Sequence, residues 1–106
     1  MANYLLVYHG GGTPESADGQ AKVMQAWTDW FGKLGPAIVD GGNPASQSKA
    51  ISGDGSVSEV GSDPVTGYSI IKADSLGQAL DLAKGCPIFL GPRNARIEVV
   101  ETFEAM

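Results

Sequence analysis

The sequence predicts an α+β fold of the ferredoxin-like, split βαβ type: an antiparallel sheet with two helices on one face, plus an inserted β-hairpin. Two amphipathic segments with helical spacing each lie between strand-like segments. A polar stretch rich in turn residues separates the two strand-helix-strand units. Residues 1–106 are expected to form a single domain, because a chain of 106 residues holds one hydrophobic core.

The first unit is a strand, a helix and a short strand. Residues 3–9 (NYLLVYH) are rich in Tyr, Leu and Val and end at a glycine triplet, which predicts a strand. A helix is expected over residues 15–34, and Gly35-Pro36 ends it. A short strand follows over residues 37–40. The apolar side chains of the helix recur at helical spacing: Val23, Trp27, Trp30, Phe31 and Leu34.

The second unit follows a predicted hairpin around Gly53-Asp54-Gly55. Asp74 or Ser75 is expected to cap its helix, since short polar side chains accept bonds from the first helical N–H groups. The expected segments are hairpin arms at 48–52 and 56–60, a strand at 67–73, a helix at 76–84 and a strand at 95–103.

The first strand is apolar on both faces. Tyr4, Leu6 and Tyr8 alternate with Leu5 and Val7, so neither face is suited to water. Two helices cover only one face of a sheet. The simplest cover for the other face is a second copy of the chain, which predicts a homodimer that packs through its sheet faces.

Composition excludes several classes of function. Hydrophobic residues make up 42 % of the chain, which argues against disorder. The formal net charge of −5 argues against a nucleic-acid partner, and no apolar run is long enough to span a membrane. One Cys and one His offer too few ligands for a metal site, and no cofactor motif is present. The free thiol and the lack of a basic leader favour a cytoplasmic location.

Six segments, in order, resemble the YCII-related domain family. They are 4–8 (YLLVY), 35–42 (GPAIVDGG), 66–71 (TGYSII), 75–80 (SLGQAL), 85–87 (GCP) and 96–99 (RIEV), which together extend over nearly the whole chain. The resemblance implies a dimeric α+β barrel, the assembly shared with muconolactone isomerases and antibiotic-biosynthesis monooxygenases. Longer members carry Asp-Gly-Pro-Phe where this chain has Gly61-Ser62-Asp63-Pro64-Val65. Many members carry a helical His where this chain has Trp27.

The split βαβ topology predicts where a site would lie. The C-terminal ends of the first two strands share an edge of the sheet with the N-terminal ends of the last two. His9, Asp40, Tyr68 and Arg96 mark these four ends. We assign His9 as a catalytic acid or base, Asp40 as its orienting partner, and Tyr68 and Arg96 as ligand contacts. By the family resemblance, Trp27 lies beside the cavity and contacts the ligand.

Each of these residues also has a structural interpretation. His9 also suits a strand-end histidine bonded to backbone or water, the more common case, and an intervening strand separates it from Asp40 by roughly 10 Å. Arg93 is as suited to a carboxylate as Arg96. The Gly10–Gly12 loop favours flexibility, with anion binding or closure over a ligand as alternatives. Cys86 is expected to be structural, because the negative end of a helix raises a thiol pKa.

Two classes of function remain open from the sequence. The first is a small-molecule-binding protein, with proton-transfer, lyase or isomerase chemistry on a small metabolite as its enzymatic option. The second is a non-catalytic ligand-binding or accessory module. An enzyme needs a titratable group directed at its ligand and a partner that tunes this group, whereas a binding module needs only an apolar cavity with orienting donors. A cofactor-free monooxygenase is disfavoured, because no residue pattern indicates oxygen chemistry.

Overall fold

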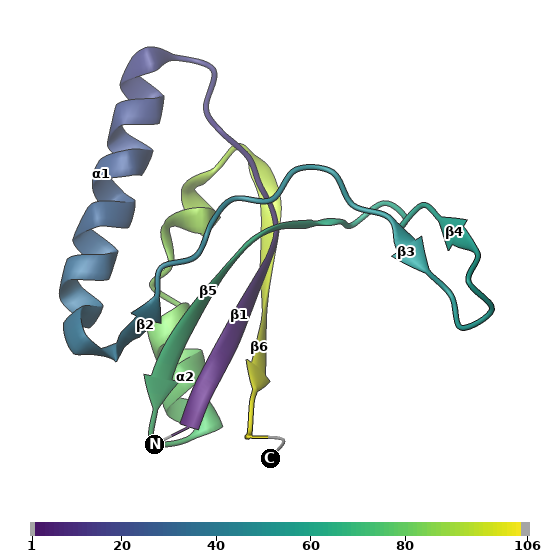
Figure 1. Ribbon diagram of the computed structural model, residues 1–106. Helices are drawn as coiled ribbons and strands as arrows, with labels where there is room; N and C mark the ends of the chain where they lie inside the picture. Colours follow the sequence, from purple (N-terminus) through teal and green to yellow (C-terminus); the bar gives the residue numbers. More distant parts are fainter. Residues whose placement is uncertain (1, 105–106) are drawn as a thin grey trace.

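The computed structural model describes residues 2–104 and has an α+β architecture (Figure 1). A four-stranded antiparallel sheet packs against two α-helices, and a separate two-stranded pair lies in the long connection between the two halves. The helices and strands are β1 (Ala2–Gly11), α1 (Ala17–Leu34), β2 (Ile38–Asp40), β3 (Ala50–Ile51), β4 (Val57–Ser58), β5 (Val65–Ala73), α2 (Leu76–Ala83) and β6 (Arg93–Glu101).

The strand order in the sheet is β2-β5-β1-β6, and all neighbouring strands are antiparallel. This order is compatible with a ferredoxin-like fold. The first strand is central: its Leu6 is opposite Ser69 of β5 on one side and Val99 of β6 on the other. The second strand is short and lies at the edge, so β5 separates it from β1. His9 and Asp40 therefore end strands that are not neighbours.

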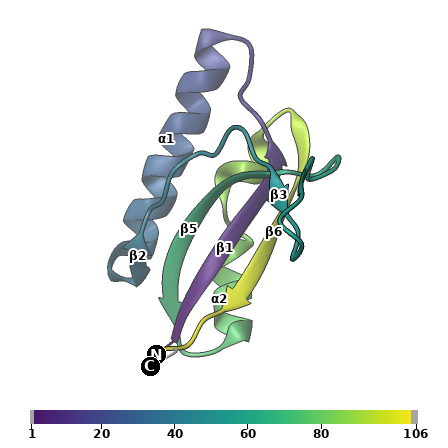
Figure 2. The ribbon, with the colours of Figure 1, turned by 45° about the vertical axis from the view of Figure 1, so that its right-hand side comes forward.

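Both helices lie on the same face of the sheet. The core forms where they meet Tyr4, Leu6 and Tyr8 of β1, and it includes the buried helical residues Trp30 and Ala79. In Figure 2 the sheet is seen with α2 behind it and no helix in front.

Local capping explains where the two helices begin. The Ser16 hydroxyl accepts a bond from the Gly19 N–H, and the Ser75 hydroxyl accepts one from the Gln78 N–H. The predicted cap of the second helix at Asp74 or Ser75 is thus Ser75. The first helix begins at Ala17, two residues later than the sequence predicts, because Ser16 takes the N-cap position.

The opposite face of the sheet carries the other half of each alternating strand. Leu5 and Val7 of β1 lie beside Ile70 and Tyr68 of β5, and all four are half-buried. Within residues 2–104 no helix covers this face, which we call the open face.

The connection between β2 and β5 projects from the body as an arm that carries β3 and β4 (Figure 1). The two strands pair through Ala50 with Ser58 and Ile51 with Val57, and each is two residues long. These strands are shorter than the predicted segments 48–52 and 56–60, because the flanking residues are polar and exposed. The Ile51 side chain is 75 % exposed. The arm lies on the side of the sheet away from α1 (Figures 1 and 2).

Two further segments differ from the sequence predictions. Residues Gly35–Ala37 and Pro87–Leu90 form short 3-10 helices, where the sequence predicts a helix end followed by a strand and, further on, no regular structure between the second helix and the last strand. A proline at the first or second position of each accounts for the tight turn, because its fixed φ suits the start of a helix. Of the helices in the described residues, none is long and apolar enough to cross a membrane.

Candidate functional site

A pocket of about 510 Å³ lies on the helical side of the sheet, between α1 and the strand ends. This volume is within the range of small-molecule sites. The pocket wall combines five segments of the chain: the end of β1 with the loop after it, the inner side of α1, the loop after β2, the start of β5, and the segment from Pro87 to Arg93. Large lining residues on this side are Tyr8, Val23, Trp27, Phe31, Ile88 and Arg93, and Tyr68, whose strand position faces the open side, borders the pocket.

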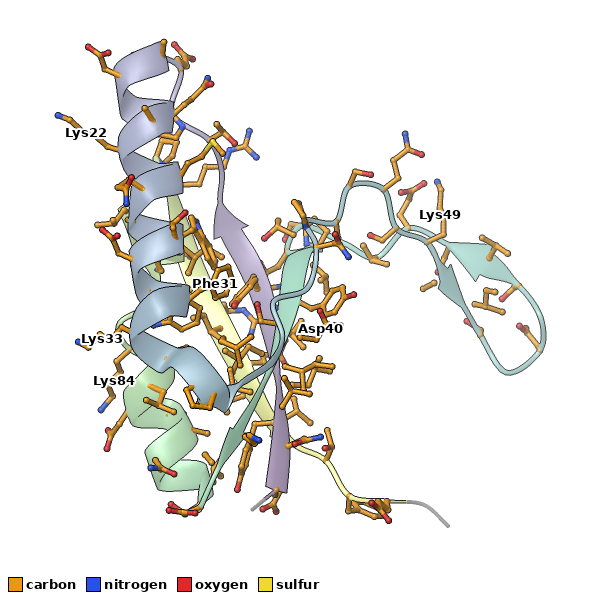
Figure 3. All side chains as sticks on the ribbon, turned by 60° about the vertical axis from the view of Figure 1, so that its left-hand side comes forward. Lys22, Phe31, Lys33, Asp40, Lys49 and Lys84 are labelled. Atoms are coloured by element: carbon orange, nitrogen blue, oxygen red, sulfur yellow. The ribbon has the colours of Figure 1, made fainter. Side chains whose placement is uncertain are left out.

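Aromatic rings form one wall of this pocket. The Trp27 ring meets Tyr8 edge to face, with centroids 5.6 Å apart and planes at 68°. It also packs against Trp30 at 5.7 Å and Phe31 at 5.7 Å. In Figure 3 Phe31 points from α1 towards the sheet, whereas Lys33 of the same helix points away from it. This cluster holds Trp27 in place and presents an aromatic, apolar surface to a ligand.

Two glycines permit the backbone to close the pocket tightly. Gly42 has φ +76°, and a Cβ there would lie 1.7 Å from the Tyr68 carbonyl oxygen. Gly10 has φ +73°, and a Cβ there would lie 1.9 Å from the Asn94 carbonyl oxygen. Both positions combine a left-handed backbone with no room for a side chain. The turn at Gly42 is fixed further by its N–H, which donates to the Asp40 carboxylate over 2.8 Å.

A second site, which is polar, lies on the open face around His9. The His9 side chain is only 6 % exposed. Its Nε2 is 2.6 Å from Oε1 of Glu98, and its Nδ1 is 3.0 Å from the Asp63 carbonyl oxygen. Both ring nitrogens thus face oxygen atoms, and which nitrogen donates depends on the tautomer of the ring. The Arg96 Nε donates to the Asp63 carboxylate over 2.6 Å and completes the group, which we call the His9 cluster.

The structure divides the five residues singled out from the sequence between these two sites. Trp27 and Tyr68 line the pocket. His9 and Arg96 are opposite each other on β1 and β6 and belong to the His9 cluster. Asp40 is exposed and bonds the backbone of its own turn. The expected His9–Asp40 pair is therefore not formed, because β5 lies between their strands, and Glu98 and Asp63 bond His9 instead.

Sequence reasoning missed the partners of His9 for two different reasons. Glu98 was identifiable, because it lies two residues from Arg96 and so shares its face of the strand. Asp63 was not, because it lies in the long connection before β5, where no periodicity places a side chain. Arg93 and Arg96 are three residues apart and face opposite sides of β6, which explains why Arg93 lines the pocket and Arg96 does not.

Two further questions about the site concern the reactivity of the Cys86 thiol and the capacity of the side chains to bind a metal ion. Burial raises the pKa of the Cys86 thiol from 9.0 to about 11, so the thiol is neutral at physiological pH. The raised value agrees with the expected direction, but burial rather than the helix end is its main cause. Across residues 2–104, no group of three or more His, Cys, Asp or Glu side chains has an arrangement that could hold a metal ion.

Comparisons with known proteins leave the site to be interpreted from its chemistry alone. Neither a scan against protein-family models nor a search of curated proteins found a match to this chain.

Proposed function

We propose that this chain is a small-molecule-binding protein of the YCII-related type, and that its ligand occupies the pocket between α1 and the sheet. One observation carries the proposal: a cavity of about 510 Å³ with an aromatic wall formed by Tyr8, Trp27 and Phe31. A pocket of this size and composition is the usual setting for a small organic ligand. The cytoplasmic location remains an expectation of the sequence.

Ligand binding without catalysis is the function that the lining favours. The pocket-lining groups that titrate are the two tyrosines, and His9 is not among the lining residues. Burial raises the Tyr8 pKa further above its usual value of 10.0, which makes this hydroxyl a poor base at neutral pH. The accessory, non-catalytic interpretation therefore takes precedence over proton-transfer chemistry in this pocket.

Proton-transfer, lyase or isomerase chemistry is the second candidate, and the His9 cluster favours it. A buried imidazole 2.6 Å from a carboxylate is the pairing that general acid–base catalysis uses. Such a reaction requires a substrate on the open face rather than in the pocket. Loss of turnover in His9→Ala, together with retained ligand affinity in the pocket, is the result that would favour this candidate.

We also propose that the chain assembles as a homodimer, a dimeric α+β barrel, through its open face. Leu5, Val7 and Ile70 supply an apolar centre there, and specific interfaces bury roughly 800 Å² per partner. The arm supports the same assembly, because it projects on the side where a second copy would lie (Figure 2). Its exposed Ile51 and Val57 side chains would gain a partner in such a dimer.

A thermal-shift screen against a metabolite library tests the binding function. A ligand is expected to raise the melting temperature of the wild type, by mass action on the folded state. The shift is expected to vanish in Trp27→Ala and to persist in Met24→Ala, a matched truncation on the outer side of the same helix, where Met24 is 71 % exposed. Equal shifts in both variants would place the ligand elsewhere and overturn the proposal.

A further inference from the structure

The charge of the pocket lining is unusual for an acidic protein. The chain carries a formal net charge of −5, yet no Asp or Glu is among the described residues that line the pocket. Arg93 is the one lining residue with a permanent charge, and the others are aromatic, aliphatic, small or neutral polar residues. The local charge of the pocket is thus opposite in sign to that of the whole chain.

The two arginines of β6 differ in their bonding. Arg96 donates to the Asp63 carboxylate over 2.6 Å and lies 3.4 Å from Glu98, so its charge is compensated within the chain. Within residues 2–104, Arg93 has neither an ion-pair nor a hydrogen-bond partner for its guanidinium. Its five N–H donors are available to a ligand.

The position of Arg93 on β6 places its side chain along the edge of the pocket. It begins β6 opposite Gly11, where the pairing with β1 is irregular. A Cβ on Gly12 would lie 3.5 Å from the Arg93 side-chain carbons, so this stem runs over the glycine loop. The glycines leave room for the stem, which brings the guanidinium to the rim of a pocket with an aromatic wall.

We infer that the pocket selects aromatic monocarboxylates, with Arg93 as the residue that determines specificity; this inference rests on the proposed function. Planar guanidinium binds a carboxylate through two parallel N–H···O bonds, and the wall that contains Trp27 and Phe31 packs against an aryl ring. A single guanidinium matches a single negative charge. A phosphate monoester carries more charge and usually draws on several donors, so it fits this lining less well.

Matched pairs of ligands isolate the contribution of the negative charge. The probes are benzoate, 3-phenylpropionate and indole-3-acetate, each with its primary amide, and phenyl phosphate is the competing anion. Affinities are measured by calorimetry with wild type, Arg93→Gln and Lys22→Gln, a loss of the same charge from the outer side of α1 (Figure 3). At least one carboxylate is expected to bind wild type tenfold or more tightly than its amide.

The variants show whether Arg93 causes this difference. Arg93→Gln is expected to bring the carboxylate to the affinity of its amide, whereas Lys22→Gln preserves the preference. Unchanged amide affinity in Arg93→Gln shows that the variant is folded, and Arg93→Lys, which keeps the charge but lacks the fork, is expected to recover only part of the preference.

Three results would overturn the inference. Equal affinity for carboxylates and amides would refute it and leave the proposed function intact. Binding of phenyl phosphate in preference to every carboxylate would refute the ligand class. If no carboxylate and no amide binds, the inference fails, and the thermal-shift screen with Trp27→Ala decides the proposed function separately.

Discussion

Tyr8 and Ser69 join the two central strands by a buried hydrogen bond: the Tyr8 hydroxyl donates to Ser69 Oγ over 2.7 Å. Ser69 in turn donates to the Gly41 carbonyl over 2.7 Å, so one chain of bonds links β1, β5 and the loop after β2. This chain of bonds fixes the floor of the pocket, because Tyr8 and Gly41 both line it. A fully satisfied buried network of this kind specifies one arrangement of its members.

Removing the Tyr8 hydroxyl is expected to destabilise the fold without creating a cavity in the core. Tyr8→Phe keeps the ring but leaves Ser69 Oγ without its donor, which costs about 1 kcal/mol of unfolding free energy. Urea denaturation measures this loss. Tyr68→Phe is the control, because its hydroxyl has no bond within residues 2–104, and it is expected to change stability by less than about 0.5 kcal/mol. A Tyr8→Phe protein as stable as wild type would contradict the role of this bond.

His9 is expected to stabilise the sheet and to be dispensable for binding in the pocket. His9→Ala removes the contacts of the ring nitrogens with Glu98 and the Asp63 carbonyl, so we expect a loss of about 2 kcal/mol in unfolding free energy. Ligand affinity in the pocket is expected to stay within about twofold of wild type, because His9 is not among its lining residues.

Two measurements, chemical denaturation and calorimetric titration, separate these effects. Lys72→Ala is the control on β5, since Lys72 is exposed and is expected to leave both quantities unchanged. Wild-type stability together with lost affinity in His9→Ala would instead assign His9 to the ligand site.

The same chemical change at two glycines is expected to have opposite effects. Gly42→Ala places a methyl group 1.7 Å from the Tyr68 carbonyl oxygen at a left-handed φ, and we expect a loss of more than about 2 kcal/mol. Gly32→Ala adds a methyl group to the exposed side of α1, where nothing lies within 4 Å. Helix propensity then predicts a gain of about 0.5–1 kcal/mol. Thermal melts of both variants test the pair, and a tolerated Gly42→Ala would refute the close approach.

The Cys86 thiol predicts a loss of stability in alkali. Its pKa is about 11 in the folded chain and 9.0 in the unfolded reference, so the folded state holds the proton more tightly. This contribution is complete below about pH 9 and is lost as pH rises to about 11, a change of about 2 kcal/mol. Urea titrations at several pH values measure it.

Cys86→Ala is the control for this pH effect, because Tyr8 also contributes in alkali and is present in both proteins. The difference in unfolding free energy between wild type and variant is expected to shrink as pH rises through this window. A difference that is independent of pH would show that the thiol is not protected by burial.

The proposed dimer predicts that a charge at the centre of the open face yields monomers. Wild type is expected to sediment at twice the chain mass of 11.0 kDa, and Ile70→Lys at the mass of one chain. Burying an unpaired ammonium group in an apolar interface costs several kcal/mol. Met24→Lys, a similar change on exposed α1, is expected to remain dimeric. A monomeric wild type at micromolar concentration would refute the assembly.

Periodicity predicted most of the fold, because the strands and helices bury one face each. Trp30 and Leu34 are buried as their helical spacing predicts, and the central position of β5 between β1 and β2 follows from split βαβ topology. The sequence pattern did not predict the short 3-10 helices, because three or four residues around a proline carry no periodic signal. The extents of β3 and β4 were overestimated, because polar flanks give no preferred face.

The candidate site was predicted only as a region. Strand ends indicated the edge of the sheet at which the pocket and the His9 cluster lie, but not which face each side chain occupies. His9 follows Tyr8 in the sequence and so lies on the opposite face of β1, away from the pocket that Tyr8 lines. Irregular pairing near Gly11 and the long connection that carries Asp63 then decide the contacts of Arg93 and His9. Neither is visible from residue type or spacing.

The close backbone approaches at the glycines give a criterion by which distant relatives can be recognised. Gly10, Gly42 and Gly91 each leave less than 2.5 Å between a hypothetical Cβ and a backbone oxygen, so no other residue fits without a shift of the main chain. Aromatic residues in the pocket can exchange for one another at small cost, whereas these three positions cannot change alone. Searches for relatives can therefore require glycine at these positions and leave the ligand-facing residues free to vary.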